Sequence, residues 1–557
     1  MTRPAGSPVP GGAFTAHTHP HSYWSTTNVG EAMPGVPTPL CWSVWGPAAD
    51  RGARGPFATM GVLERDLVVP GDERDRAVSI FAGRVAARVD FLAEMGDRIP
   101  GTSGRAVVEQ YLGSVPPGLT FRRVRRRYPV IAARFPSAFL TVRPRLIAAH
   151  RDTLTWWPEQ IRRAPTLPLE PARALLAEAA GRFSDLVLLQ GNGMFVGVQP
   201  MYDAVLKLIR AHDLQHLFGP LTGGGGEHAE TEIVTDLWRL GRDQLSLAAF
   251  LGRHGYHGPH EGELSATVWR EHPEPVLRLA ARYRDRDRSA DPELTARRRT
   301  RERQDAEREL LAALPAAKRP AARTVLALAR RNVPMRGVGK SAFLRAFDVT
   351  RAAARRVGAL LAESAALADP EDVFYLTLDE LTGPMPADAP ELVAARRAER
   401  AELQRLQPPT TWQGTPTLTP VEPDRTSPAR VPGSASGSGS GRASGSAPVT
   451  GLGVSAGIVE GVVRVVHEPD FDDVEPDEIL VAPTTDPSWA SIMFLSRALV
   501  VDIGGHLSHA AIVARELGVP CVVDTGDGTR RLRTGDLVRV DGSAGRIDII
   551  EPADSGR

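Results

Sequence analysis

The stretch from residue 498 to residue 520 constrains the fold of this chain more tightly than any other. An apolar run rich in valine and isoleucine, 498–503, ends in Gly504 and Gly505, and an amphipathic pattern then continues to Gly518. An apolar run of this length is typical of a buried strand, and apolar residues at three- and four-residue spacing are typical of a helix. The order of signals therefore predicts a strand, a tight glycine turn and a short helix that stops at Gly518.

The start of this helix predicts a place where an anion binds. Ser508 is a good N-cap residue, so His509 is expected in the first turn. Backbone N–H groups without intrahelical partners and the positive end of the helix dipole favour an anion there. A neutral imidazole at this position has the chemistry of a nucleophile toward phosphorus. The residues alone leave an alternative open, which is a capped surface helix that carries a histidine without a function.

The motif Gly-Gly-x-x-Ser-His-Ala-Ala-Ile-Val-Ala-Arg-Glu-Leu-Gly-Val-Pro at 504–520 resembles a known signature. It is similar to the phosphohistidine motif of the swivelling domain in phosphoenolpyruvate synthase, pyruvate phosphate dikinase and rifampicin phosphotransferase. The flanking segments 453–463, 481–489 and 534–542 resemble the opening hairpin, the T-x-P-x-W loop and the closing strands of that domain. The resemblance implies a C-terminal β/β/α swivelling domain over residues 451–552. In that domain His509 is phosphorylated, and Gly504, Gly505 and Ser508 bind the phosphate.

Composition excludes several other classes. The chain has 557 residues, with 67 Lys and Arg against 66 Asp and Glu, so no net field draws it to nucleic acid or to a membrane. Cys41 and Cys521 are too few for a disulfide framework, which favours a reducing compartment. No run of about 18 apolar residues and no signal-peptide pattern occurs. We therefore predict a cytoplasmic protein with two to four domains.

Three further regions precede the swivelling domain. Residues 1–21 are rich in Pro and Gly and are predicted to be a disordered leader. Alternating His17, His19 and His21 fit flexible polar sequence better than a dedicated site, so we predict no metal centre. Residues 22–405 show mostly helical periodicity. Residues 406–450 turn to Pro, Gly and Ser and predict a flexible linker spanning roughly 35 Å, as a carrier that travels between two sites requires.

Parts of the helical region resemble rifampicin phosphotransferase. The segment 24–43 resembles the stretch that follows the ATP-grasp domain in that family. The segment 250–273 resembles an element that helps to form the acceptor site, with matches at Glu261, Trp269, Glu271 and Pro273. Two positions depart from the pattern, because His257 stands where the family has Arg, and Glu263 stands where it has Asp. An arginine holds phosphate with a permanent charge, whereas a histidine also acts as a general base near neutral pH.

These segments supply the candidates for an acceptor site. They are His257, Glu261 and Glu263, with Thr231 and Glu232 after a run of four glycines, and Arg336 from a further family-like segment. A structural role for His257, a plain surface loop for the glycines and a solvated Arg336 are the alternatives.

The stretch Gly337-Val338-Gly339-Lys340-Ser341 resembles the end of a phosphate-binding P-loop. Pro334 occupies the position of the first glycine, however, and no strand precedes the stretch. We therefore predict a helix at this position and no ATP site.

Together these features predict a multidomain α plus α/β phosphotransferase component. A stand-alone ATP-grasp subunit, holding ATP and Mg2+, is expected to load His509, and a small-molecule hydroxyl in the helical domain is expected to receive the group. Two alternatives stay open: a binding or regulatory homologue without turnover, and a carrier loaded from phosphoenolpyruvate by another enzyme.

Overall fold

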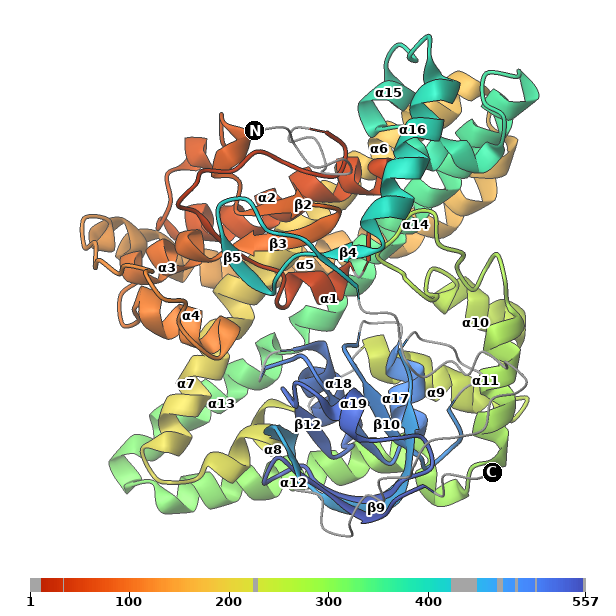
Figure 1. Ribbon diagram of the computed structural model, residues 1–557. Helices are drawn as coiled ribbons and strands as arrows, with labels where there is room; N and C mark the ends of the chain where they lie inside the picture. The colour runs from red at the N-terminus through yellow and green to blue at the C-terminus, as the bar shows by residue number, and fades with distance from the viewer. Residues whose placement is uncertain are drawn as a thin grey trace, which may run out of the picture.

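The computed structural model describes residues 12–33, 35–223, 229–421, 448–467, 474–485, 489–505 and 508–553. These residues form a helical body up to residue 421 and a smaller C-terminal domain built on a mixed sheet (Figure 1). The combination of a mostly helical region with a C-terminal α/β domain confirms the predicted fold class. None of the described helices combines the length and the apolar character needed to cross a membrane.

Four long helices form the centre of the helical body: α2 (Pro39–Met60), α5 (Tyr128–Arg163), α6 (Leu169–Asn192) and α14 (Met335–Glu363). α14 packs against α5 and α6, and α2 packs against α6. Phe183 of α6 and Phe347 of α14 are fully buried and their rings lie 5.0 Å apart. Because α14 is covered on several sides, small and apolar residues occupy most of its surface.

Further helices extend this centre on both sides. They are α1 (Val29–Ala32), α3 (Val89–Arg98), α4 (Gly104–Leu112), α7 (Gln199–Arg210), α8 (Phe218–Thr222), α9 (Ala229–Gly241), α10 (Leu247–His254), α11 (Glu274–Asp285), α12 (Pro292–Ala313), α13 (Arg319–Asn332), α15 (Leu378–Thr382) and α16 (Ala389–Leu403).

An antiparallel sheet joins distant parts of the body in the order β2-β3-β1-β5. Its strands are β1 (Tyr23–Ser25), β2 (Val78–Phe81), β3 (Arg84–Arg88) and β5 (Thr411–Gln413). Trp24 of β1 pairs with Trp412 of β5, and the Trp412 ring meets Phe81 edge-on at 5.5 Å. The apolar contact of Trp412 thus draws residues just beyond α16 back onto the body.

The structure differs from the predicted linker at its start. Strand β5 lies inside the range 406–450, and β4 (Leu406–Gln407) pairs there with β6 (Thr419–Pro420). The reason is a single aromatic residue, Trp412, within otherwise polar sequence, which gives the segment something to bury. Residues 422–447 of the predicted linker lie outside the described residues.

The predicted leader also differs from the structure over residues 12–21. Phe14 is 1% exposed, and its carbonyl accepts a hydrogen bond from Gly83 N at 2.8 Å. Ala16 N donates to the carbonyl of Ile80 at 2.9 Å, so the segment lies along the β2–β3 hairpin. One buried phenylalanine therefore orders a stretch whose composition alone predicts disorder. Residues 1–11 lie outside the described part of the chain.

The C-terminal domain is built on one sheet with the order β7-β14-β13-β9-β10-β11-β12-β8. The contiguous strands β9, β10, β11 and β12 pair in parallel, and the other pairs are antiparallel. The strands are β7 (Val449–Thr450), β8 (Leu452–Ser455), β9 (Ile458–Val465), β10 (Ile479–Ala482), β11 (Ala498–Val501), β12 (Cys521–Val523), β13 (Leu537–Asp541) and β14 (Arg546–Glu551).

Both faces of the parallel strands are buried. Leu480 and Leu499 lie in a core shared with α17 (Ala490–Leu495) and α18 (His509–Leu517), whereas Val481 and Val500 lie in the core of the opposite face. Burial on two faces explains why these strands read as continuous apolar runs without alternation. The short helix α19 (Gly528–Arg531) completes the domain.

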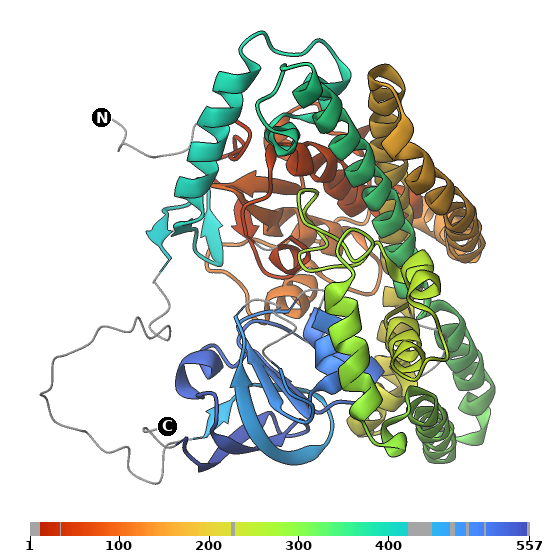
Figure 2. The same ribbon diagram turned by 90° about the vertical axis from the view of Figure 1, so that its right-hand side faces the viewer.

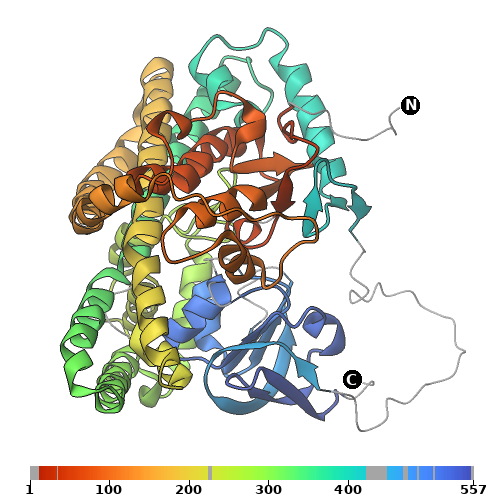
Figure 3. The ribbon, with the colours of Figure 1, turned by 90° about the vertical axis from the view of Figure 1, so that its left-hand side faces the viewer.

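The core beneath α17 and α18 continues into the helical body. Trp238 of α9 and Phe250 of α10 belong to the same buried apolar cluster as Met493 and Val513 of the C-terminal domain. Figure 2 shows this side, with the blue domain beside the yellow-green helices. Figure 3 shows the molecule from the opposite side. A further contact joins the domain to α8, where the Arg515 guanidinium lies 5.9 Å from the Phe218 ring. The C-terminal domain is therefore docked on the body through a continuous hydrophobic core.

Polar contacts from α11 and its C-cap residue Arg286 secure the edge of this interface. Arg286 donates to the carbonyl of Phe494 at 2.8 Å and pairs with Asp477 at 3.3 Å. Arg282 donates to the carbonyl of Val474, and Tyr283 stacks on the Phe494 ring at 5.8 Å. One helix of the body thus contacts both the 474–477 segment and the end of α17.

Reversing one of these charges tests the docked arrangement. In Arg286→Glu the new carboxylate faces Asp477 and the donor to Phe494 is lost, which we expect to weaken docking by about 2 kcal/mol, roughly thirtyfold. Small-angle scattering is expected to show a larger radius of gyration, and α9 amides are expected to exchange faster. Arg278→Glu, on the exposed face of the same helix, is the matched control. Identical scattering for both variants would contradict the interface.

Candidate active site

His509 is the first residue of α18, and Ser508 is its N-cap. Ser508 has extended backbone angles and its hydroxyl accepts a hydrogen bond from Ala511 N at 3.4 Å. Strand β11 ends at Val501, and Gly518 closes the helix with φ of 68°. These features confirm the predicted strand, turn and helix for the described residues. His506 and Leu507 lie outside them.

The glycines in the turn have separate roles. A Cβ on Gly504 would lie 2.9 Å from the Ser508 hydroxyl, so this position needs a residue without a side chain. A Cβ on Gly505 would meet nothing within 4 Å among the described atoms, so the space beside Gly505 is open to a ligand. Both glycines therefore fit the predicted phosphate-binding turn next to the N-terminal N–H groups of α18.

Thr485 fixes the imidazole of His509. The Thr485 hydroxyl, on the segment that follows β10, lies 3.2 Å from Nδ1 of His509. Thr485 is buried, while His509 is half-buried. When Nδ1–H donates to this hydroxyl, the ring orientation is set and Nε2 carries the lone pair. Thr485 lies in the predicted T-x-P-x-W loop but was not predicted as a site residue.

The loop between α10 and α11 carries two buried ionisable side chains. His257 and Glu261 are 6% and 3% exposed, and Nδ1 of His257 lies 2.7 Å from the Glu261 carboxylate. Trp269 N donates to the carbonyl of His257 at 2.7 Å, and Arg270 N donates to that of Gly255 at 2.9 Å. The loop folds back on itself through these bonds, which hold the two side chains together.

Lys340 of α14 pairs with the carboxylate of Glu261. Its ammonium lies 3.5 Å from the second carboxylate oxygen of Glu261. Burial acts to raise the pKa of Glu261, but Lys340, His257 and His509 together outweigh it, and the pKa is lowered. Glu261 is therefore an ionised carboxylate in a buried position. His509 thus acts electrostatically on the loop 255–273, named the acceptor loop below after its predicted role, and α18, which His509 begins, packs against α9.

Lys340, which pairs with Glu261, was not among the residues predicted for the acceptor site. It belongs to the Gly337–Ser341 stretch, which lies within α14 and is not a P-loop, as predicted. The sequence did contain a signal, because Lys207, Lys318 and Lys340 are its only lysines among many arginines. A lysine placed where this chain otherwise uses arginine marks a position that takes a compact cation.

Glu263 has a structural role in the same loop. Its carboxylate accepts hydrogen bonds from the Thr38 hydroxyl at 2.7 Å and the Thr38 N–H at 3.0 Å, and from both donors of Ser265 at 3.0 Å. Thr38 is the N-cap of α2. Glu263 was predicted as an acceptor-site residue, but its oxygens are occupied in tying the loop to α2.

The other predicted acceptor residues lie on the helices around this loop. Arg336 is half-buried and sits one turn before Lys340 on α14, so the two share a helix face. Thr231 and Glu232 lie near the start of α9, which packs against α14, α17 and α18. Glu232 is exposed, and the side chain of Thr231 and residues 224–228 are not among the described parts.

A buried ion network anchors the acceptor loop to α14. The Asp348 carboxylate, fully buried, accepts hydrogen bonds from Arg270 at 2.9 Å, Trp157 at 2.9 Å and Arg351 at 3.1 Å. Arg351 also donates to the carbonyls of Glu263 and Leu264. Burial acts to raise the pKa of Asp348, but the two guanidinium groups prevail and lower it. The helix that carries Lys340 therefore also holds the loop that carries Glu261.

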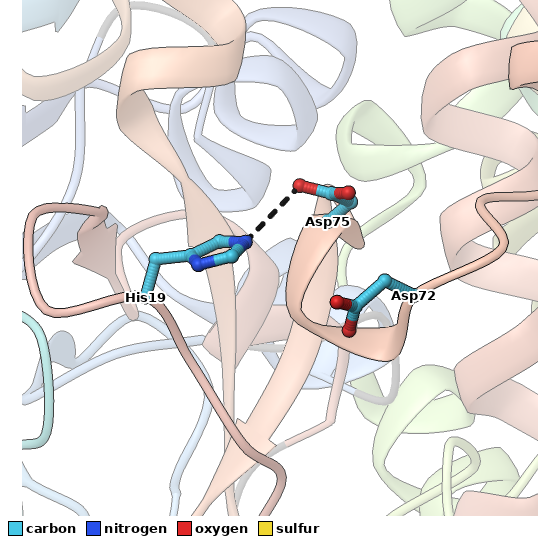
Figure 4. Close-up of side chains that lie close together, drawn as sticks. All are labelled: His19, Asp72 and Asp75. Carbon is cyan, nitrogen blue, oxygen red and sulfur yellow. Dashed lines mark ion pairs between the residues drawn. The ribbon is translucent and has the colours of Figure 1, made fainter.

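A second cluster of ionisable groups lies away from this site. His19, Asp72 and Asp75 approach one another closely enough to share an ion (Figure 4). Arg74, however, donates to both oxygens of Asp72, and this bond holds the pKa of Asp72 at about 2. Because Asp72 already has a cationic partner, we assign no metal to this group.

Comparisons with protein families match two parts of the chain. Residues 474–545 match the mobile domain of PEP-utilising enzymes, which places His509 and Thr485 within that domain. Residues 242–337 match the fourth domain of rifampicin phosphotransferase, and this range includes His257 and Glu261. Lys340 lies three residues beyond the second match.

Curated relatives align with slightly more than half of the chain. An uncharacterised protein of Mycobacterium tuberculosis is 36% identical over 54% of this chain and 30% of its own length. A rifampicin phosphotransferase of Streptomyces sviceus is 31% identical over 55% of this chain and 34% of its own length. A rifampicin phosphotransferase of Bacillus subtilis is 27% identical over 54% of this chain and 34% of its own length. The chain therefore aligns with about a third of the length of these relatives.

Substituting Asp348 tests the anchor of the acceptor loop. Asp348→Asn keeps the shape but removes the acidic partner of Arg351 and one of the two acidic partners of Arg270, which keeps only Glu271 at 3.0 Å. We expect this loss to cost about 3 kcal/mol. Chemical denaturation followed by tryptophan fluorescence measures the change. Because the folded-state pKa of Asp348 is lowered, its stabilisation is complete above the unfolded pKa, near 4, and is lost as pH falls below it.

The variant is accordingly expected to lose less stability than the wild type on acidification. Asp285→Asn, at an exposed position of α11, is the control and is expected to stay within about 0.5 kcal/mol of the wild type. Equal unfolding free energies for the two variants would refute the anchoring role of Asp348.

Proposed function

We propose that this chain, which joins a PEP-utilising-enzyme mobile domain to a region related to the fourth domain of rifampicin phosphotransferase, transfers a phosphoryl group from His509 to a small-molecule hydroxyl. The observation that carries the proposal is electrostatic. His509 and Lys340 both act to lower the pKa of Glu261, and the Lys340 ammonium lies 3.5 Å from the Glu261 carboxylate. His509 belongs to one family match and Glu261 to the other, which supports the proposal.

In the first half-reaction His509 receives the group. With Nδ1–H donating to Thr485, Nε2 attacks a phosphorus of ATP and the bond from that phosphorus to its leaving oxygen breaks. The N-terminal N–H groups of α18 stabilise the added negative charge. The donor in this proposal is a separate ATP-grasp subunit that binds ATP and Mg2+. Phosphoryl transfer depends mainly on alignment and on neutralising charge. The open space beside Gly505 supports access of the group to the ring.

In the second half-reaction the C-terminal domain is docked as observed. The phosphoryl group on His509 then lies near Glu261, whose negative charge opposes it, and near Lys340, whose positive charge offsets both. Arg336, one turn away on α14, adds a second cation on the same helix face. An acceptor hydroxyl bound at the 255–273 loop attacks phosphorus, and the N–P bond breaks. The relatives' name makes rifampicin the first acceptor to test.

Labelling tests this function. When the chain is mixed with radiolabelled ATP, Mg2+ and a stand-alone ATP-grasp protein, we expect acid-labile, base-stable label on the wild type and none on His509→Ala. His467→Ala changes an exposed histidine of the same domain and is expected to label normally. Adding rifampicin is expected to move the label to the small molecule. Label that persists in His509→Ala would rule out this carrier, and labelling by phosphoenolpyruvate in place of ATP would replace the proposed donor.

A further inference from the structure

His257 presents a buried nitrogen that no described residue satisfies. Its Nδ1 is bonded to Glu261 at 2.7 Å, whereas its Nε2 is buried and has no hydrogen-bond partner among the residues that the structure describes. The side chain is 7% exposed. A buried polar atom without a partner costs free energy, so such an atom calls for a ligand that supplies one.

Glu261 determines which atom that ligand meets. Because the Glu261 carboxylate is ionised, it accepts the hydrogen on Nδ1, and a neutral His257 then carries its lone pair on Nε2. Lys340 lies on the other oxygen of the carboxylate and helps to keep it charged. The histidine is thereby fixed in one tautomer and orientation, with a proton acceptor at its far nitrogen.

The same loop offers a second unsatisfied atom of complementary chemistry. The indole Nε1–H of Trp269 is buried without a partner in the described structure, and the Trp269 ring lies 5.7 Å from the His257 ring. The backbone of Trp269 is bonded to that of His257, so the two residues hold their relative position. A hydroxyl group donates one hydrogen bond and accepts others, which matches a loop that lacks both a donor and an acceptor partner.

We propose that His257 is the general base of the transfer step, with Nε2 taking the proton of the acceptor hydroxyl. This assignment rests on the proposed function. As the O–H bond breaks toward Nε2, the oxygen forms a bond to phosphorus, the N–P bond breaks and its electron pair returns to the His509 ring. His257 becomes an imidazolium that Glu261 stabilises, and it releases the proton to water after the product leaves.

Charged or titratable side chains near His257 come from its own loop, from α14, from the end of α10 and from the start of α18. Glu261 lies on its own loop, and Lys340 and Arg345 lie on α14, with the Arg345 guanidinium 4.4 Å from the adjacent Tyr256 ring. His254 ends α10, and its Nε2 lies 2.9 Å from Asp236 of α9. His509 approaches from α18. His254 already has an acidic partner, which makes it a matched histidine that the step does not use.

The experiment separates loading from discharge. Phosphoramidate, a general chemical donor to histidine, loads His509 without any partner subunit, and the loaded chain is then exposed to rifampicin, to glycerol and to water. Loss of phosphohistidine is followed over a range of pH in the wild type, His257→Gln, His257→Ala and His254→Gln. We expect equal loading throughout and a discharge rate about 100-fold lower in both His257 variants.

Three further results distinguish a base from a structural residue. The wild-type rate is expected to depend on pH, a dependence that His257→Gln lacks and His254→Gln keeps. Added imidazole is expected to restore discharge in His257→Ala. Circular dichroism and scattering report whether each variant is folded and docked.

Two outcomes overturn the assignment in different ways. Discharge of His257→Gln at the wild-type rate, with the wild-type pH profile, refutes the base and leaves the phosphotransfer proposal standing. A loaded wild type that keeps its phosphoryl group with all three acceptors refutes both proposals.

Discussion

The carboxylate of Asp348 is the contact on which the acceptor region depends. The loop from 255 to 273 contains no strand or α-helix, so its shape rests on bonds to its surroundings. Asp348 binds Arg270 near the end of the loop, and through Arg351 it reaches the carbonyls of Glu263 and Leu264 near the middle. Removing three charges from water costs free energy, which only close pairing and complete hydrogen bonding offset. The result is a loop fixed to the same helix that supplies Lys340.

Docking of the C-terminal domain introduces a second constraint. A domain that moves between two sites normally meets each through a modest, rather polar interface, yet here Trp238 and Phe250 share a core with Met493 and Val513. Such an interface stabilises the docked state strongly. Arg282 and Arg286 add contacts at its rim, where they are within reach of solvent and therefore respond to salt. The docked position of the C-terminal domain is accordingly stabilised mainly by apolar burial.

Local signals in the sequence predicted one half of the site, because each of its features depends on neighbours in the chain. Gly504, Ser508 and Gly518 define the turn and helix around His509 through capping and backbone freedom alone. The other half depends on tertiary contacts. Nothing near Lys340 indicates that it meets Glu261, and nothing near Glu263 indicates that Thr38, far back in the sequence, occupies its carboxylate. The burial of Phe14 and Trp412 was not predicted for the same reason. Each is a single apolar residue in polar sequence, and its packing partners lie far away in the chain.

The histidine at position 257, where the resembled family pattern has an arginine, fits this geometry. An arginine would place a permanent cation beside Glu261 and would have no lone pair to accept a proton. With histidine, the positive charge next to Glu261 comes from Lys340, and the ring nitrogen facing away from the carboxylate becomes a proton acceptor. In the proposed reaction, Lys340 on α14 supplies the positive charge and His257 on the loop accepts the proton. Asp348 fixes the loop to α14. The core under α18 packs the domain that carries His509 against α9 and α10, and α10 leads into the loop with His257 and Glu261. In the proposed transfer, docking and chemistry are therefore linked through one apolar contact.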